Sequence, residues 1–224
     1  MKATVETTPL GQQIESALKE EITTGRLVPG QRIGIEELAA RWSVSSTPVR
    51  DAVRRLEGAG FLNVHPRRGI YVAELDENDF RDIFELRIAL ECQAAESATL
   101  LAPEAELDRV LQLYQEAQQH FQETGERSLL AERDYMAHDL LMQYCRNARL
   151  VEIMRNLRDL IDWAQASIVA RQPEAYDITV HEHMCIVKAM RARDVAAARE
   201  AVRAHLEGAL RRMQWQGQER AVSA

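Results

Sequence analysis

The sequence of 224 residues is poor in cysteine, in aromatic residues and in long apolar runs. Its three cysteines (Cys92, Cys145 and Cys185) are widely spaced within apolar helical patterns, which predicts buried thiols rather than disulfides or a paired-cysteine metal site. No run of about 18 apolar residues occurs, so no membrane span or membrane partner is expected. The N-terminal residues lack the apolar core of a secretion signal, and we expect a cytoplasmic protein.

Composition and charge predict two helical domains with different tasks. Ala, Leu, Glu and Arg dominate, which favours helix, and the length suits two domains of modest size. Residues 1–75 carry ten Lys/Arg against nine Asp/Glu, a balance of +1, whereas residues 76–224 carry eighteen against twenty-six, a balance of −8. A weakly basic first domain and an acidic second one indicate that only the first meets nucleic acid.

The stretch from Gly34 to Val72 predicts a winged helix-turn-helix. It contains two short helical patterns separated by a polar turn, and the second has Pro48 in its first turn after Thr47, the expected N-cap. Arg50 and Arg54 lie four residues apart and share one face of this second helix. The opposite, apolar face repeats at helical spacing and comprises Val49, Ala52, Val53 and Leu56. A short helix with an apolar side and a basic side is what a recognition helix requires.

A basic hairpin follows. Phe61–Val64 and Ile70–Val72 predict two short strands, and the tip between them carries Arg67, Arg68 and Gly69. Such a tip suits contact with phosphates or with the minor groove. Residues 41–68 contain six arginines and two acidic residues, a local net charge of +4 in a chain of net charge −7. The alternative interpretation is an ordinary amphipathic helix with a solvated charged face.

The segments GRLVPGQRI and VSSTPVRDAVRRLE, with the hairpin, resemble the winged-helix domain of the GntR family of bacterial transcription regulators over about residues 10–73. The resemblance implies a dimer that binds an inverted-repeat operator in double-stranded DNA. It places Thr47 and Arg50 at DNA-contacting positions and Gly69 at the wing glycine. Ser46 and Glu36 depart from the family, which has Arg usually at the first position and frequently at the second, so possible phosphate or base contacts are removed.

Beyond Asp79 the pattern is entirely helical and predicts an antiparallel bundle. The expected helices run from 79 to about 101, from 103 to 124, from 128 to 145, from 150 to about 171, from 176 to 193 and from 194 to 214, the last with Asp194 as its N-cap. The domain boundary is placed at Glu74–Asn78, which gives domains at 1–75 and 76–224. The fold class is therefore mainly α, with a small β wing.

Four residues of the bundle form a candidate metal site. Asp134 and His138 stand four apart, on one face of one expected helix. His183 lies ten residues before Arg193, at the expected helix turn, and His205 lies twelve after it. Antiparallel packing therefore brings both to the same height, about 15 Å from the turn. Three imidazoles and a carboxylate suit Zn²⁺, with Ni²⁺ and Mn²⁺ as alternatives. The competing interpretation is a chance spacing without a ligand role.

The segments RDYMAHDL, EHMCIVKAMRARD and AREAVRAHL resemble the helical effector-binding domain named FCD, which accompanies the GntR domain in the FadR-type subfamily. The resemblance covers about residues 79–215. It implies that Asp134, His138, His183 and His205 hold a metal ion. It also places Arg87, in ELRIALE, near an effector site, where a guanidinium could bind a carboxylate in bidentate fashion. The alternative for Arg87 is a salt bridge on the helix surface with Asp82 or Glu91.

These observations predict a DNA-binding transcription regulator, expected to be a dimeric repressor controlled by a small organic acid that binds at or near a divalent metal. One alternative is a metal-dependent hydrolase with a DNA-binding head, although no general base or oxyanion donor is evident beside the four expected ligands. A second alternative is a DNA-binding protein whose metal is purely structural. A ligand screen by thermal shift, with and without chelator, separates this second alternative from the main interpretation.

Overall fold

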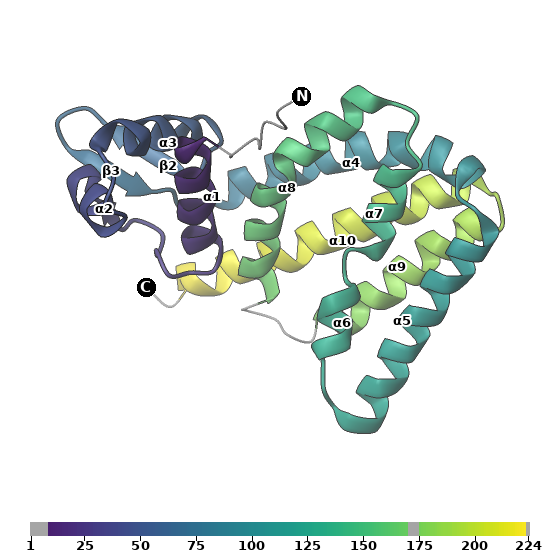
Figure 1. Ribbon diagram of the computed structural model, residues 1–224. Coiled ribbons are helices and arrows are strands. Elements are labelled where there is room, and N and C mark those ends of the chain that lie inside the picture. The colour runs from purple at the N-terminus through teal and green to yellow at the C-terminus, as the bar shows by residue number, and fades with distance from the viewer. Residues whose placement is uncertain (1–8, 170–174, 223–224) are drawn as a thin grey trace, which may run out of the picture. The chain divides into compact units, whose positions relative to one another are not determined.

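The chain forms two compact units, one ending at Leu75 and the other beginning at Asp76. The computed structural model describes residues 9–169 and 175–222, and the side chains of residues 9–163 and 176–212 (Figure 1). The first unit combines three helices with a small antiparallel sheet, and every element described in the second unit is a helix. The expected winged helix-turn-helix and helical bundle are therefore confirmed.

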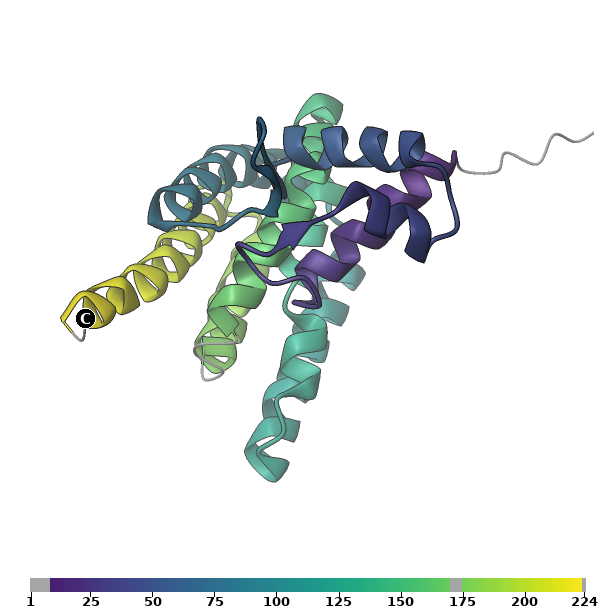
Figure 2. The ribbon, with the colours of Figure 1, turned by 90° about the vertical axis from the view of Figure 1, so that its left-hand side faces the viewer.

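The first unit is held together by the apolar faces of its helices. The helices are α1 (Leu10–Thr23), α2 (Ile35–Arg41) and α3 (Ser46–Gly58). Leu18 and Ile22 of α1 and Leu56 of α3 are almost completely buried, because α1 packs along the apolar side of α3. A second view of these helices is given in Figure 2. This packing leaves the basic side of α3 on the surface.

The N-terminus of α3 differs from the expectation. The N-cap is Ser45, which has an extended backbone, and its side chain makes no capping hydrogen bond. Thr47 lies inside the first turn, so its prediction as N-cap is wrong. Pro48 still occupies the first turn, where a missing N–H leaves no helical bond unmade. The hydroxyl of Thr47 is therefore not committed to a cap.

The sheet contains β1 (Arg32–Ile33), β2 (Leu62–His65) and β3 (Gly69–Val72) in the order β1-β3-β2. The β2–β3 hairpin is the expected wing, with β2 one residue later than predicted and β3 beginning one residue earlier. The β1 strand is too short to show a periodic pattern in the sequence. Gly69 has φ +123°, and a Cβ there would lie 3.0 Å from Nε of Arg32. The wing therefore favours glycine at this position for its backbone conformation, and a Cβ would also require the Arg32 side chain to shift.

The second unit is a bundle of antiparallel helices. They are α4 (Glu77–Leu101), α5 (Glu104–Thr124), α6 (Ser128–Arg133), α7 (Met136–Gln143), α8 (Ala148–Val169), α9 (Ala175–Arg191) and α10 (Val195–Val222). The α10 helix runs beside α4 and α9, and α5 runs beside α9 (Figures 1 and 2). The turn from α9 to α10 is where the sequence predicts it, with Arg193 at φ 58°. Asp194 is the N-cap of α10, since its Oδ1 accepts from the backbone N–H of Ala197 at 2.9 Å.

A helix break at Asp134 and Tyr135 corrects the prediction of one helix over 128–145. The α6 helix ends at Arg133 and α7 begins at Met136. An unbroken helix would direct the N–H of Ala137 to the carbonyl of Arg133, but this N–H donates instead to the hydroxyl of Tyr114 at 2.9 Å. Asp134 therefore terminates one helix and does not share a continuous helix with His138.

Candidate metal centre

Three histidines from three helices meet in the core of the bundle. His138 comes from α7, His183 from α9 and His205 from α10, and all three are buried. Nε2 of His183 lies 3.1 Å from Nε2 of His138 and 3.2 Å from Nε2 of His205. The antiparallel α9–α10 hairpin brings the latter two to one height, as the residue count from its turn indicates.

Carboxylates hold the far side of two of these rings, one of them buried (Glu91) and one partly exposed (Glu182). Nδ1 of His138 lies 2.5 Å from Glu91 of α4, and Nδ1 of His205 lies 2.8 Å from Glu182 of α9. A neutral imidazole that donates from Nδ1 has a lone pair on Nε2, so both of these lone pairs point into the shared space. Neighbouring lone pairs repel each other, and a cation between them would remove the conflict. A carboxylate behind each ring is also the usual support of a metal-binding histidine.

Burial keeps two of the three rings neutral. Burial, and then the neighbouring His205 and His138, hold the pKa of His183 well below its ordinary value. Burial lowers the pKa of His205 to about 4, although the hydrogen bond with Glu182 opposes the shift. Metal ligands must be deprotonated, so at neutral pH these two imidazoles are in the form that binds a divalent ion.

Asp134 lies beside His183, with its Oδ1 3.8 Å from Nδ1. Neither of these buried atoms has a hydrogen-bond partner among the described residues. The three histidine ligand atoms lie within 4.8 Å of one another, and Asp134 does not belong to that group. Burial raises the pKa of Asp134 to about 6, although His138 and Arg87 lower it. A desolvated carboxylate without a partner favours a nearby cation.

The donor set fits a divalent ion. Imidazole nitrogens at about 2.0–2.1 Å from one ion lie about 2.8–3.4 Å apart, with the lower values in octahedral and the upper values in tetrahedral geometry. The observed separations of 3.1 and 3.2 Å fall in this interval. Beside the cluster, Oδ1 of Asp134 is a buried carboxylate oxygen that has no hydrogen-bond partner among the described residues. The cluster therefore has the chemistry of a metal site.

Arg87 of α4 is part of the same buried network. It is 1% exposed, its Nε donates to Glu91 at 2.8 Å, and its Nη2 lies 3.4 Å from Nε2 of His138. The alternative interpretation, a salt bridge on the helix surface, named Glu91 as a partner of Arg87. It is wrong about the location, because this pair is buried. Burial raises the pKa of Glu91, but the Arg87 charge, with the hydrogen bond from His138, outweighs burial and holds this pKa below the ordinary value. Arg87 and Glu91 thus form a buried ion pair behind His138.

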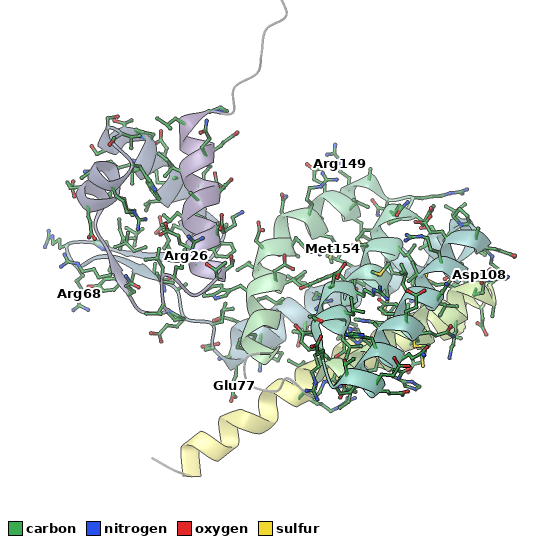
Figure 3. The ribbon with its side chains drawn as sticks, turned by 60° about the horizontal axis from the view of Figure 1, so that its bottom comes forward. Arg26, Arg68, Glu77, Asp108, Arg149 and Met154 are labelled. Atoms are coloured by element: carbon green, nitrogen blue, oxygen red, sulfur yellow. The ribbon has the colours of Figure 1, made fainter. Side chains whose placement is uncertain are left out.

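A cavity of about 310 Å³ opens beside Arg87 and His138. Its wall is formed by α4, α7 and α8 with Tyr135, and the lining residues beyond Arg87 and His138 are Glu91, Tyr135, Asp139, Met142, Gln143, Val151, Met154, Arg155, Arg158 and Ile161. Figure 3 labels Met154 on α8. This volume is within the range of small-molecule sites, and its inner end reaches a metal-ligand candidate.

Sequence reasoning missed several residues of this site. Glu91 lies four residues after Arg87, a spacing that gives a signal for their pairing but not for its burial. Glu182 directly precedes His183, and nothing in that adjacency indicates that it would contact His205. The two arginines of α8 that line the cavity, Arg155 and Arg158, sit in a charged helix pattern without any distinguishing feature.

The expected DNA-contacting residues lie on the surface of the first unit. Arg50 and Arg54 are exposed on α3 with Thr47. Arg67 and Arg68 are exposed at the tip of the wing, which Figure 3 marks by Arg68, and Gly69 follows them at the start of β3.

The arginines of this unit divide into paired and unpaired groups. Arg41 pairs with Glu21 at 2.8 Å and Arg55 pairs with Glu15 at 2.5 Å, so both fasten helices to α1. Nη2 of Arg50 lies 3.3 Å from Oε1 of Glu36, and both side chains are exposed. Within residues 9–75, the side chains of Arg54, Arg67 and Arg68 form no ion pair, so their guanidiniums are free on this surface.

Comparisons with known proteins agree with this architecture. Residues 10–72 match the bacterial regulatory proteins of the gntR family, and residues 82–208 match the FCD domain. The chain is 30% identical over 207 residues to the HTH-type transcriptional repressor RspR of Escherichia coli (strain K12), over 90% of this chain and 87% of that protein. It is 29% identical over 198 residues to the HTH-type transcriptional regulator YdhC of Bacillus subtilis (strain 168), over 88% of each chain.

The solved structure of McbR/YncC of E. coli has the same fold, with a TM-score of 0.69 at 21% identity over 94% of this chain and 99% of that one. Within the described residues, no helix is long and apolar enough to cross a membrane. The relatives are named as transcription regulators and not as enzymes. The chain therefore belongs to the GntR family of bacterial regulatory proteins, as a DNA-binding transcription regulator in which the GntR domain is joined to an FCD domain.

Proposed function

We propose that a small organic acid, bound beside a divalent metal in the FCD domain, controls the DNA binding of this regulator. Asp134, His138, His183 and His205 would hold the ion, with Zn²⁺ the preferred candidate among Zn²⁺, Ni²⁺ and Mn²⁺. The bound ion would supply a Lewis-acid position for a carboxylate oxygen of the effector. Arg87, at the inner end of the cavity, would orient that carboxylate through its guanidinium.

The observation that carries this proposal is the convergence of three buried imidazoles, one of which, His138, lines the inner end of a cavity together with a buried arginine. A purely structural metal would need no cavity beside it. The opening at His138 and Arg87 therefore favours a ligand site over a structural ion alone. The effector would act by binding to one arrangement of the bundle more tightly than to another.

Operator binding provides the test. Fluorescence anisotropy of a labelled operator would be titrated with a panel of small carboxylic acids, using the full chain loaded with Zn²⁺ and the same chain after chelation. We expect at least one acid to change operator affinity by about 5–150-fold, the usual range of allosteric coupling, and only in the loaded protein. An equal response with and without metal would contradict the role given to the ion.

On the DNA side we propose a homodimer that represses transcription from an inverted-repeat operator. The recognition helix α3 would enter the major groove with Thr47, Arg50 and Arg54. The wing would contact the backbone or minor groove through Arg67, Arg68 and the backbone at Gly69. The exposure of the five side chains, with three free guanidiniums among them, supports these roles.

Arg50 and Arg67 should differ in kind when replaced. We expect Arg50→Ala to weaken operator binding by about 1–3 kcal/mol and to relax sequence preference, because a base contact is lost. Arg67→Ala should weaken operator and random DNA alike and reduce the salt dependence, because a phosphate contact is lost. Titrations of both DNAs at several salt concentrations distinguish the two patterns. Unchanged operator affinity in Arg50→Ala would show that α3 does not read the operator.

Glu36 supplies a matched control for that measurement. Its carboxylate pairs with Arg50 in the free protein, and exposed pairs of this kind contribute only about 0–1 kcal/mol to stability. Glu36→Gln should therefore leave the fold intact while releasing the Arg50 guanidinium. A change in operator preference in this variant would then come from the released Arg50 on the DNA-binding surface and not from a change in the fold.

Metal affinity should depend on pH through Asp134. Ordinary imidazoles predict a loss near pH 6.5, but the pKa of His205 is lowered to about 4, whereas that of Asp134 is raised to about 6. As pH falls, the proton therefore enters Asp134 before His205, and affinity should fall about tenfold per pH unit below about pH 6. Asp134→Asn should bind more weakly but lose this dependence. Competition with a chromophoric chelator measures both, and the same slope in the two proteins would exclude Asp134 as a ligand.

A further inference from the structure

Among the described residues, one arginine that lines the cavity beside His138 has no ion-pair partner. Of its three lining arginines, Arg87 is paired with Glu91. Arg158 is held by Asp139 at 2.9 Å and Asp162 at 3.1 Å, and it stacks on the ring of Tyr135 at 4.0 Å. Arg155 lines the cavity and is exposed, and no described residue forms an ion pair or hydrogen bond with its side chain.

Arg87 and Arg155 lie in different surroundings, one buried and the other exposed to solvent. Arg87 and His138 are 1% and 5% exposed, so they mark the buried inner end, whereas the exposed Arg155 marks the solvent side. The residues between are largely apolar and come from α7 and from one face of α8: Met142, Val151, Met154 and Ile161. A ligand that reaches from one end to the other must therefore have an apolar middle.

The volume limits the size of that ligand. At about 30 Å³ per water molecule, a cavity of about 310 Å³ has room for roughly ten non-hydrogen atoms. Nucleotides and acyl thioesters of coenzymes are much larger than this. A short chain with a polar group at each end is of the right size.

We infer that the ligand of this cavity is a small dicarboxylate with an apolar spacer, whose inner carboxylate lies at the Arg87 end and whose outer carboxylate pairs with Arg155. The inference rests on the proposed function for the inner carboxylate and adds the outer one. Arg155 is then the residue that distinguishes a dicarboxylate from a monocarboxylate. Its guanidinium binds a planar carboxylate through two parallel hydrogen bonds, whereas the paired Arg158 holds the wall of the site.

Two matched series of acids test this in the full chain loaded with Zn²⁺. Isothermal titration would compare butanedioate, pentanedioate and hexanedioate with butanoate, pentanoate and hexanoate. We expect one dicarboxylate to bind roughly three- to tenfold more tightly than the monocarboxylate of equal length, the gain expected of a partly exposed arginine pair. Arg155→Ala should remove this preference while monocarboxylate affinity stays unchanged, and Arg155→Lys should restore part of it.

Arg149→Ala is the control, because Arg149 lies on the same helix, does not line the cavity and is 88% exposed beside Glu152 (Figure 3). It should retain the wild-type preference. Equal affinities for the two series, or a preference that survives in Arg155→Ala, would overturn the inference and leave the proposed function standing. Failure of every acid in both series to bind would overturn both.

Discussion

His183→Ala should purify without the stoichiometric metal ion that the wild-type chain retains, whereas His181→Ala should retain it. His183 is completely buried, and its Nε2 stands between those of His138 and His205, at 3.1 and 3.2 Å. Removing it takes away the central donor. The two remaining imidazoles with one carboxylate should bind the ion far more weakly, since even loss of a supporting residue typically lowers metal affinity 10–100-fold.

The comparison with His181 isolates this effect. His181 lies two residues earlier on α9, so it points to another side of the helix and is exposed. Metal content would be measured by elemental analysis after equal dialysis of the three proteins. Equal occupancy in His183→Ala and His181→Ala would reject the assignment of His183. His183→Asn, which fills more of the space, separates loss of the ligand from loss of packing.

Chelation should also lower the melting temperature of the wild-type protein. An ion bound only to the folded chain at 100 times its dissociation constant adds about 2.7 kcal/mol, which corresponds to roughly 5–10 °C for a chain of this size. The same treatment should not change the melting temperature of His183→Ala. An unchanged wild-type melting temperature after chelation would mean that the ion does not join α7, α9 and α10.

Arg87→Ala should destabilise the FCD domain by about 3–5 kcal/mol, because it leaves the buried Glu91 without its cation. Glu91 is fully buried, and the pair distance is 2.8 Å. The family position of Arg87 alone predicts a different result, namely loss of the effector response with an otherwise intact protein. Unfolding by urea, followed by circular dichroism, measures the difference.

A second variant separates the structural role of Arg87 from its effector role. Combining Arg87→Ala with Glu91→Gln removes the orphan charge, and the amide oxygen still accepts from Nδ1 of His138. This double variant should regain much of the lost stability and should still fail to respond to the effector. A response at ordinary effector concentration would make Arg87 a purely structural residue.

Arg81→Ala is the control for the stability measurement. Arg81 lies on the same helix, but its side chain is 48% exposed beside Asp82. Exposed pairs contribute at most about 1 kcal/mol, so this variant should melt close to the wild type. If Arg87→Ala were no less stable than Arg81→Ala, the buried ion pair would not exist in the protein.

The sequence by itself determined the winged helix, because its signals are local. The apolar stripe from Val49 to Leu56, Pro48 in the first helical turn and the basic hairpin tip are all read within a few residues. It also placed His183 and His205 at one height, since a helical hairpin with a recognisable turn at Arg193–Asp194 converts residue counts into distances.

The tertiary structure alone decided what surrounds these residues. The hydroxyl of Tyr114, more than twenty residues away, accepts a hydrogen bond from the N–H of Ala137. The helix therefore breaks, and Asp134 lies at a helix end. Glu91 and Glu182 reach the histidines from other helices, and burial determines the charges and pKa values of the cluster. The cavity at Arg155 likewise exists only where α4, α7 and α8 meet. Such contacts depend on how helices distant in sequence pack, and spacing along one helix does not encode them.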